Sequence, residues 1–362
     1  MEIGVYTLAR VTPDPVTGRV QSMGAHVRDL IEEIELADQV GLDVYGVGEN
    51  HRPDFSVAAP AVVLAAAASR TKRIRLTSSV SVLGSADPVR LFQDFATVDL
   101  ISDGRAEIMV GRGASTESFP LFGCDVDDYD DLFAEKLELL LRLRDQEVVT
   151  WAGRHRAPLV GQGVYPRPVQ ASLPVWVGVF ANPNSAERAG RLGVPMALAF
   201  LAGTYERSLS VVNAYREAGT LAGHDPATLA VSLSNHGYVS ETSQAVASEF
   251  FPYYASAMDA LAIERGFPRV DRKRFRAMRE LEGPVIAGSP DEVIEKILFQ
   301  HEIFGNQRFT MLISVGGMPH RSVLRSIELF GTEVAPVVRA ELASRTSDVS
   351  RPFAMDAAAD LV

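Results

Sequence analysis

The stretch LISDGRAEIMVGRG, Leu100 to Gly113, combines a short buried strand with an arginine held between two glycines. Ala106–Val110 is an apolar run typical of a buried strand. Gly111 and Gly113 allow a ligand to approach the backbone without a Cβ in the way. Arg112 offers a planar fork of donors suited to a phosphate or carboxylate. A surface arginine in an ordinary turn would explain the same residues, but the combination predicts a binding site where this strand ends.

The composition is typical of a water-soluble globular protein with a large core. The chain has 362 residues, 47% of them hydrophobic, and a net charge of −11. This charge disfavours nucleic acid and anionic membranes as main partners. No apolar run approaches the roughly 20 residues that span a bilayer, and no secretion signal precedes the first strand-like residues, so we expect a cytoplasmic protein. A single cysteine excludes an internal disulfide and a cysteine-rich metal site, and we expect no metal.

Short apolar runs separated by amphipathic stretches recur along the whole chain and predict alternating strands and helices. The predicted strands are Ile3–Thr7, Val44–Gly48, Ile74–Val82, Ala106–Val110, Val175–Val179, Met196–Phe200, Ala230–Ser234 and Phe309–Ser314. Apolar parallel strands joined by helices indicate an α/β fold, and this number of units closes a (β/α)8 TIM barrel. A doubly wound open sheet is the alternative.

We expect one barrel domain over residues 1–336, followed by a C-terminal extension over residues 337–362. Two segments exceed what a minimal barrel needs. The segment 147–173 is rich in glycine and proline and indicates an irregular loop or a hairpin. The segment 251–283 mixes aromatic and charged residues and is typical of a lid, an interface or a disordered loop, of which we favour the lid.

In a barrel the ligand lies at the C-terminal ends of the strands, so the residues that end the strands form one candidate site. They are Tyr6, Thr7, Glu49, Asn50, His51, Ser78, Ser79, Val80, Ser81, Gly111, Arg112, Gly113, Phe180 to Ser185 (with Asn182 and Asn184), Asn235, His236 and 314–317.

Glu49, Asn50 and His51 place a carboxylate, an amide and an imidazole at one strand end. These groups suit proton transfer or hydrogen bonding to a heteroaromatic ring. A structural explanation is also open, in which Glu49 pairs with an arginine and His51 begins the next loop. No second histidine lies one helical turn away and no cysteine is near, which disfavours a metal site.

The segment Phe180 to Ser185 follows the fifth predicted strand and opens a predicted helix, Ala186–Leu192. Asn182 or Asn184 suits the N-cap, and the free amides of a helix N-terminus favour a phosphate. Ordinary capping explains the same residues. Arg112, from the neighbouring strand end, favours the phosphate site.

Five motifs in order make the chain similar to the bacterial luciferase-like family of flavin-dependent monooxygenases. They are VGLDVYGVGENHRPDF (40–55), RTKRIRLTSSVSVLGSADPVRLFQDFATVDLISDGRAEIMVGRG (70–113), YPRPVQASLPVWVG (165–178), RAGRLGVPMAL (188–198) and AGSPDEVIEKI (287–297). Each motif is weak alone, but together they span nearly the whole chain.

The resemblance implies a barrel that holds reduced FMN, with its phosphate near Arg112 and the loop 182–185. It also implies a non-prolyl cis peptide between Ser79 and Val80, under the flavin ring. We therefore assign catalysis to Glu49, Asn50 and His51. Cofactor binding is assigned to Tyr6, Ser78, Ser79, Val80, Gly111, Arg112, Gly113, Phe180, Asn182, Asn184 and Ser185.

Three positions depart from the family pattern. Relatives commonly have a histidine where this chain has Asn50, and an amide cannot exchange a proton near neutral pH. Gly111 stands where luciferase has a cysteine. Asp130 stands where luciferase has a second phosphate-binding arginine, which leaves Arg112 with less help.

The function expected from the residues and the resemblance is an FMN-dependent monooxygenase that uses reduced flavin and O2 to oxidise a small organic substrate. The electrons would come from a separate flavin reductase or from NAD(P)H, and we expect a homodimer. One alternative is a deazaflavin (F420)-dependent hydride transferase. Another is a flavin-binding protein with little turnover, which the replacement of the family histidine by Asn50 suggests.

Overall fold

Eight parallel strands close into a barrel in the computed structural model, which describes residues 1–113, 116–266 and 268–349. The ring closes because β10 pairs with β9 and also with β12, which in turn pairs with β1. The (β/α)8 barrel is therefore confirmed and the open sheet is wrong. The barrel strands are β1 (Glu2–Thr7), β2 (Val44–Val47), β3 (Arg75–Ser78), β5 (Ala106–Gly111), β8 (Val175–Val179), β9 (Met196–Ala199), β10 (Val231–Val239) and β12 (Arg308–Ser314).

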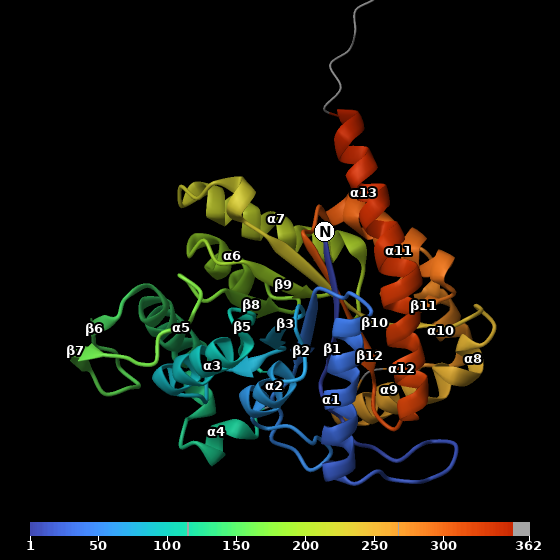
Figure 1. Ribbon diagram of the computed structural model, residues 1–362, viewed down its shortest axis with the longest axis horizontal. Coiled ribbons are helices and arrows are strands. Elements are labelled where there is room, and N and C mark those ends of the chain that lie inside the picture. The colour runs from blue at the N-terminus through green and yellow to red at the C-terminus, as the bar shows by residue number, and fades with distance from the viewer. Residues whose placement is uncertain (114–115, 267, 350–362) are drawn as a thin grey trace, which may run out of the picture.

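Helices surround the barrel and cover the outward faces of its strands (Figure 1). Several begin at side chains that cap free backbone amides, such as Asp87, Thr204 and Ser289. The covering helices are α1 (Met23–Gln39), α2 (Pro60–Ala68), α3 (Pro88–Ser102), α5 (Tyr129–Asp145), α6 (Pro183–Arg191), α7 (Tyr205–Leu221), α11 (Pro290–Phe304), α12 (His320–Leu329) and α13 (Ala335–Val349). None of the helices in the described ranges is long and apolar enough to cross a membrane.

Two of the predicted strands differ from the observed ones. The run 74–82 is not one strand, because a cis peptide between Ser79 and Val80 separates β3 from β4 (Ser81–Val82). This cis bond is the one that the family resemblance implied. The seventh strand does not end at Ser234 but continues to Val239, because residues 236–239 pair in parallel with residues 285–288. Asn235 and His236 therefore lie within a strand.

A short strand, β11 (Val285–Gly288), was not predicted and pairs with the end of β10. Its four residues lie between a proline and the N-cap of α11, so the sequence pattern there resembles a loop. β11 extends the sheet beyond the closed barrel.

The two long segments are ordered elements packed beside the barrel. The segment 147–173 forms an antiparallel hairpin, β6 (Val148–Trp151) and β7 (Leu159–Gly163), at the edge of the molecule (Figure 1). The segment 251–283 forms α9 (Phe251–Arg265) and α10 (Arg272–Arg279), after a short α8 (Val246–Glu249). α9 and α10 bury an aromatic cluster against the ends of β10 and β11.

The expected boundary at residue 337 falls inside α13. This helix buries Val338 and is in contact with α11, and it projects from the top of the molecule in Figure 1. The later residues of the expected extension, 350–362, lie outside the described residues.

Candidate functional site

The strand residues that face the barrel interior can be identified from one contact across it. Arg308 on β12 donates two hydrogen bonds to the carboxylate of Glu107 on β5, at 2.7 and 3.0 Å. These strands are not neighbours in the barrel, so both side chains point inward. Successive residues of a strand alternate between faces, so Leu312 also points inward. Its register partners are Tyr6 on β1 and His236 on β10, which share this face near the C-terminal end.

Ser79 and Val80 form a floor across this end of the barrel, which we call the mouth. A Cβ on Gly46 would lie 2.9 Å from the Ser79 Cβ, and a Cβ on Gly111 or Gly178 would lie 2.7 Å from a Val80 methyl. The three glycines therefore make room for the two side chains. Ser79, Val80 and Gly111 were predicted site residues. Gly46 and Gly178 were not predicted. A glycine near the C-terminal end of a strand could have indicated them, because it often marks a place where another group approaches the backbone closely.

Glu49 links this floor to His51. Its carboxylate accepts a hydrogen bond from the backbone N–H of Val82 at 3.0 Å, and its other oxygen lies 2.9 Å from His51 Nε2. The Glu49 N–H donates to the carbonyl of Val80 at 3.2 Å. Glu49 therefore fixes both the floor and the orientation of the His51 imidazole. The imidazole also packs edge-on against the Phe122 ring, 5.3 Å away.

Asn50 does not share this arrangement. Its side-chain amide donates to the carbonyl of Leu8 at 3.1 Å, and its backbone N–H donates to Val57 at 3.0 Å. These bonds join the loops that follow β1 and β2. The structure thus gives Asn50 a contact between loops, whereas Glu49 and His51 form a hydrogen-bonded pair.

Arg112 lies at the edge of the mouth, but an acidic residue already contacts it. Its guanidinium pairs with the Asp130 carboxylate at 2.5 Å and lies over the Tyr129 ring, 5.1 Å from the centroid. The Tyr129 hydroxyl donates to the carbonyl of Gly113 at 2.7 Å. The Asp130 side chain is 66% exposed, so an incoming anion has access to the pair.

The loop after β8 supplies a helix N-terminus beside the same edge, because β8 pairs with β5. Asn182 is the N-cap of α6, and its side chain accepts from the N–H of Asn184. Ser185 is buried in the first turn, whereas the Phe180 ring is largely exposed. The helix begins three residues earlier than predicted, at Pro183.

Two further residues predicted to bind the cofactor differ in whether their side chains are available to a ligand. Tyr6 is buried and faces the interior, and burial raises the pKa of its phenol well above its usual value. The Ser78 hydroxyl donates to the Met109 carbonyl at 2.8 Å and accepts from the Met109 N–H at 3.1 Å. Ser78 therefore holds β3 against β5 and is not free to bind a ligand.

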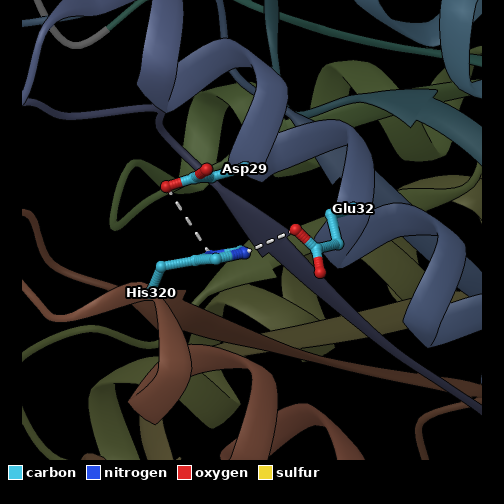
Figure 2. Close-up of side chains that lie close together, drawn as sticks. All are labelled: Asp29, Glu32 and His320. Carbon is cyan, nitrogen blue, oxygen red and sulfur yellow. Dashed lines mark hydrogen bonds and ion pairs between the residues drawn. The ribbon is translucent and has the colours of Figure 1, made fainter.

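A cleft of about 320 Å³ opens beside the mouth, between the loops that follow β1 and β12. His320, on its wall, points from α12 toward α1 and lies between Asp29 and Glu32 (Figure 2). The Glu33 carboxylate is 3.3 Å from its Nδ1. Burial opposes protonation, but hydrogen bonds and attraction from these carboxylates outweigh it and raise the pKa of His320 to about 9. His320 is therefore an imidazolium that joins the two helices.

Asp29, Glu32 and His320 could geometrically hold a cation, as could Asp128, Asp131 and His155. In the first group both ring nitrogens of the imidazole are already paired with carboxylates. In the second, His155 Nδ1 lies 3.7 Å from Asp128 and Arg154 lies near Asp131. The side chains of both groups pair with one another, and we assign neither group a metal.

Comparison with known proteins identifies the family. Residues 1–307 match the luciferase-like monooxygenase family. The crystal structure of the monooxygenase RslO1 from Streptomyces bottropensis is similar, with 28% identity, a TM-score of 0.80, and coverage of 93% of this chain and 99% of that one.

Curated relatives with named activities include a monooxygenase and a dehydrogenase. The 4-hydroxyprotoasukamycin monooxygenase of Streptomyces nodosus subsp. asukaensis is 27% identical over 85% of this chain and 86% of its own length. The F420-dependent glucose-6-phosphate dehydrogenase of Amycolatopsis mediterranei is 32% identical, but over 46% of this chain and 51% of its own length.

Proposed function

The chain belongs to the luciferase-like monooxygenase family, and we propose that it uses reduced FMN and O2 to oxidise a small organic substrate. At a coarser level it is an oxidoreductase of the flavin- or F420-dependent kind. The proposal rests on one observation. The floor of Ser79 and Val80 packs against three glycines. It lies beside Arg112 and the N-terminus of α6, which both suit a phosphate.

The residues at the mouth fit FMN in two respects. Gly46, Gly111 and Gly178 leave the floor low enough for a planar ring to lie over it without meeting inward side chains from those strands. Arg112 and the first turn of α6 offer donors on neighbouring strand ends. A phosphate that enters there must take over Arg112 from Asp130, so Asp130 reduces the affinity of the site for an anion.

Reduced FMN, when bound, would supply the electrons with which O2 is activated. The chain's own residues would bind the cofactor, orient the reacting groups and exclude water from them. Glu49 holds the His51 imidazole in one orientation, and we assign to His51 the role of holding or releasing a proton beside the mouth. Asn50 keeps the neighbouring loops together.

Helix α9 is placed to exclude water. Arg52, two residues after Asn50, donates to Glu264 at the end of α9 at 2.8 Å, and Tyr254 in the first turn of α9 is buried against His236. α9 therefore covers one side of the mouth. A site that protects a reactive intermediate needs such a cover. The partners we propose are the organic substrate, O2, and a flavin reductase or NAD(P)H as electron source.

Anaerobic binding followed by mixing with O2 tests the function. Reduced FMN is first bound to the full chain, and its oxidation is then followed by absorbance with and without candidate substrates. A monooxygenase changes the oxidation rate when substrate is present and forms an oxygenated product. Oxidation that no substrate affects would instead support a flavin-binding protein with little turnover.

A second candidate is hydride transfer with F420, supported by the relative from Amycolatopsis mediterranei. Deazaflavins do not activate O2, so the two candidates predict opposite results in one experiment. Binding of F420 in preference to FMN, with substrate-dependent F420 reduction and no O2 uptake, would replace the proposed function by this one.

A further inference from the structure

His236 and Tyr254 place two unpartnered polar atoms at the mouth. In the described part of the chain, His236 Nδ1 and the Tyr254 hydroxyl are both buried and have no hydrogen-bond partner. His236 is 7% exposed and Tyr254 is 0% exposed. The two rings meet edge to face, with centroids 5.3 Å apart and planes at 82°. Because more than about 90% of buried polar groups have a partner, two neighbouring exceptions indicate a group that is bound there.

The backbone directs this pair into the barrel rather than into the surrounding helices. Ser234 Oγ lies 2.7 Å from Thr310 Oγ1, and Thr310 shares the inward face of β12 with Arg308. His236 follows Ser234 by two residues and therefore points inward too. Tyr254 reaches it from α9, on the side of the mouth that this helix covers.

The surroundings favour an uncharged ligand group. Burial lowers the pKa of His236 to about 4, and no charged side chain contributes to that shift. The imidazole is therefore neutral and offers one donor and one acceptor. Arg274 is the charged group that acts on Tyr254, but its guanidinium donates to the carbonyl of Pro268 at 3.0 Å in an exposed position. Among the described residues no close cation faces the pair, so a carboxylate or phosphate would be desolvated here at a high cost.

We propose that His236 and Tyr254 form a subsite that binds the hydroxyl or carbonyl oxygen of the organic substrate. The subsite rests on the proposed function, in which the mouth holds the cofactor and the substrate. A ketone or aldehyde oxygen accepts from the Tyr254 hydroxyl or from the imidazole N–H, and an alcohol can also donate to the unprotonated ring nitrogen. The substrate class is thus a neutral alcohol, aldehyde or ketone, bound under α9.

Binding of three matched probes tests the subsite. Isothermal titration measures the dissociation constants of 2-heptanone, 2-heptanol and heptanoate for the full chain, with and without FMN. We expect the ketone and the alcohol to bind more tightly than heptanoate. Tyr254→Phe and His236→Leu should each weaken the two neutral probes roughly five- to tenfold, the loss of about one hydrogen bond. His236→Asn, which retains a donor and an acceptor, should retain most of the affinity.

Tyr253→Phe is the matched control, because Tyr253 is a buried phenol on the same helix that lies near Asp14 and Arg321. It should leave probe binding unchanged. The proposal is overturned if no probe binds the wild type, if heptanoate binds most tightly, or if Tyr254→Phe and His236→Leu bind the neutral probes as the wild type does.

A measurement without ligand gives a second test. Removing a hydroxyl that has no partner should keep or raise the midpoint of thermal unfolding, so Tyr254→Phe should melt no lower than the wild type. A fall of several degrees would mean that the hydroxyl is bonded within the protein, and would overturn the subsite. FMN titration is scored separately. A wild type that does not bind FMN contradicts the proposed function. Probe binding that is unchanged in Tyr254→Phe contradicts this inference.

Discussion

The two ends of the barrel interior differ in how their polar groups are paired. At the N-terminal end, Arg308 pairs with Glu107 and Glu2, and Arg75 also pairs with Glu107. The Arg308 guanidinium lies over the Trp176 ring, 4.3 Å from its centroid. At the mouth, by contrast, glycines replace side chains, His236 Nδ1 and the Tyr254 hydroxyl have no partner among the described residues, and Arg112 pairs with an exposed carboxylate.

This difference separates stability from function within one fold. Charges buried at the closed end are stable because each has a close counter-charge. Burial alone would raise the pKa of Glu107, but attraction and hydrogen bonds from Arg308 and Arg75 outweigh burial and lower it. The mouth leaves its polar groups available, as a binding site requires. Substitutions at the closed end should therefore change the free energy of unfolding, and those at the mouth should change ligand binding.

Glu107→Ala should have the largest effect on stability. It leaves Arg308, which is 2% exposed, without its buried counter-charge, and breaking such a pair costs about 3–5 kcal/mol. Urea denaturation measures the loss. Glu2→Ala is the matched control, because its side chain is 44% exposed and should contribute less than about 1 kcal/mol. Equal losses for the two variants would contradict the assignment of the closed end.

The same pair gives stability a dependence on pH. Because the pKa of Glu107 is lower in the folded chain than its usual 4.5, the pair's contribution is present above that pH. It is lost as the pH falls through the lower folded value. The wild type should therefore lose stability in acid more steeply than Glu107→Ala, as urea denaturation at a series of pH values will show.

Arg112→Ala should have the largest effect at the mouth. Loss of a charge-assisted contact to phosphate costs roughly 1.5–3 kcal/mol, or about ten- to a hundredfold in FMN affinity. Fluorescence titration with FMN measures it, and riboflavin, which has no phosphate, should show little change. Arg154→Ala, at an exposed arginine that pairs with Asp131, is the control. An Arg112→Ala variant that is folded and binds FMN normally would refute the phosphate assignment.

Gly178→Ala tests the floor. The new Cβ would lie 2.7 Å from a Val80 methyl, which must move. Overpacking of this kind typically costs about 1–3 kcal/mol, and we expect weaker FMN binding as well. Val80→Ala in the same chain should restore stability, since it removes the methyl that clashes. Failure of this rescue, measured by thermal unfolding, would mean that Gly178 serves another purpose.

Asp130→Asn should have the smallest effect, and in the opposite direction. It removes the carboxylate that competes with phosphate for Arg112, so FMN affinity should rise by about two- to fivefold, within the range of exposed ion pairs. Asp131→Asn, one residue along the same helix, should leave FMN affinity unchanged. A fall in FMN affinity in Asp130→Asn would show that Asp130 positions Arg112 for the phosphate instead.

The barrel could be predicted because its strands are short apolar runs, and the observed strands lie where these runs occur in the sequence. β8 matches its predicted range, and β5 extends one residue beyond it. The errors occur where a strand pairs with a segment far away in the sequence. Asn235 and His236 have the polar composition of a strand end, but β10 continues through them because residues 236–239 pair with β11.

The location of the site at the strand ends could be predicted from the sequence, but the partners of its side chains could not. Glu49 and His51 do lie together, whereas Asn50 and Ser78 are used within the backbone framework. The pairing of Arg112 with Asp130 spans 18 positions and depends on how α5 packs. Tyr254 could not be assigned, because its role depends on where α9 lies over the mouth.

Hydrogen exchange with and without FMN tests the central claim, that the mouth and not the closed end binds the cofactor. The full chain is labelled in D2O and analysed by mass spectrometry of its peptides. We predict slower exchange on addition of FMN in the peptides that contain Ser79–Val80, Gly111–Arg112 and the first turn of α6, and in α9 above them. Peptides at the N-terminal ends of β5 and β12 should not change. Protection confined to other parts of the chain, or none at saturating FMN, would contradict the account.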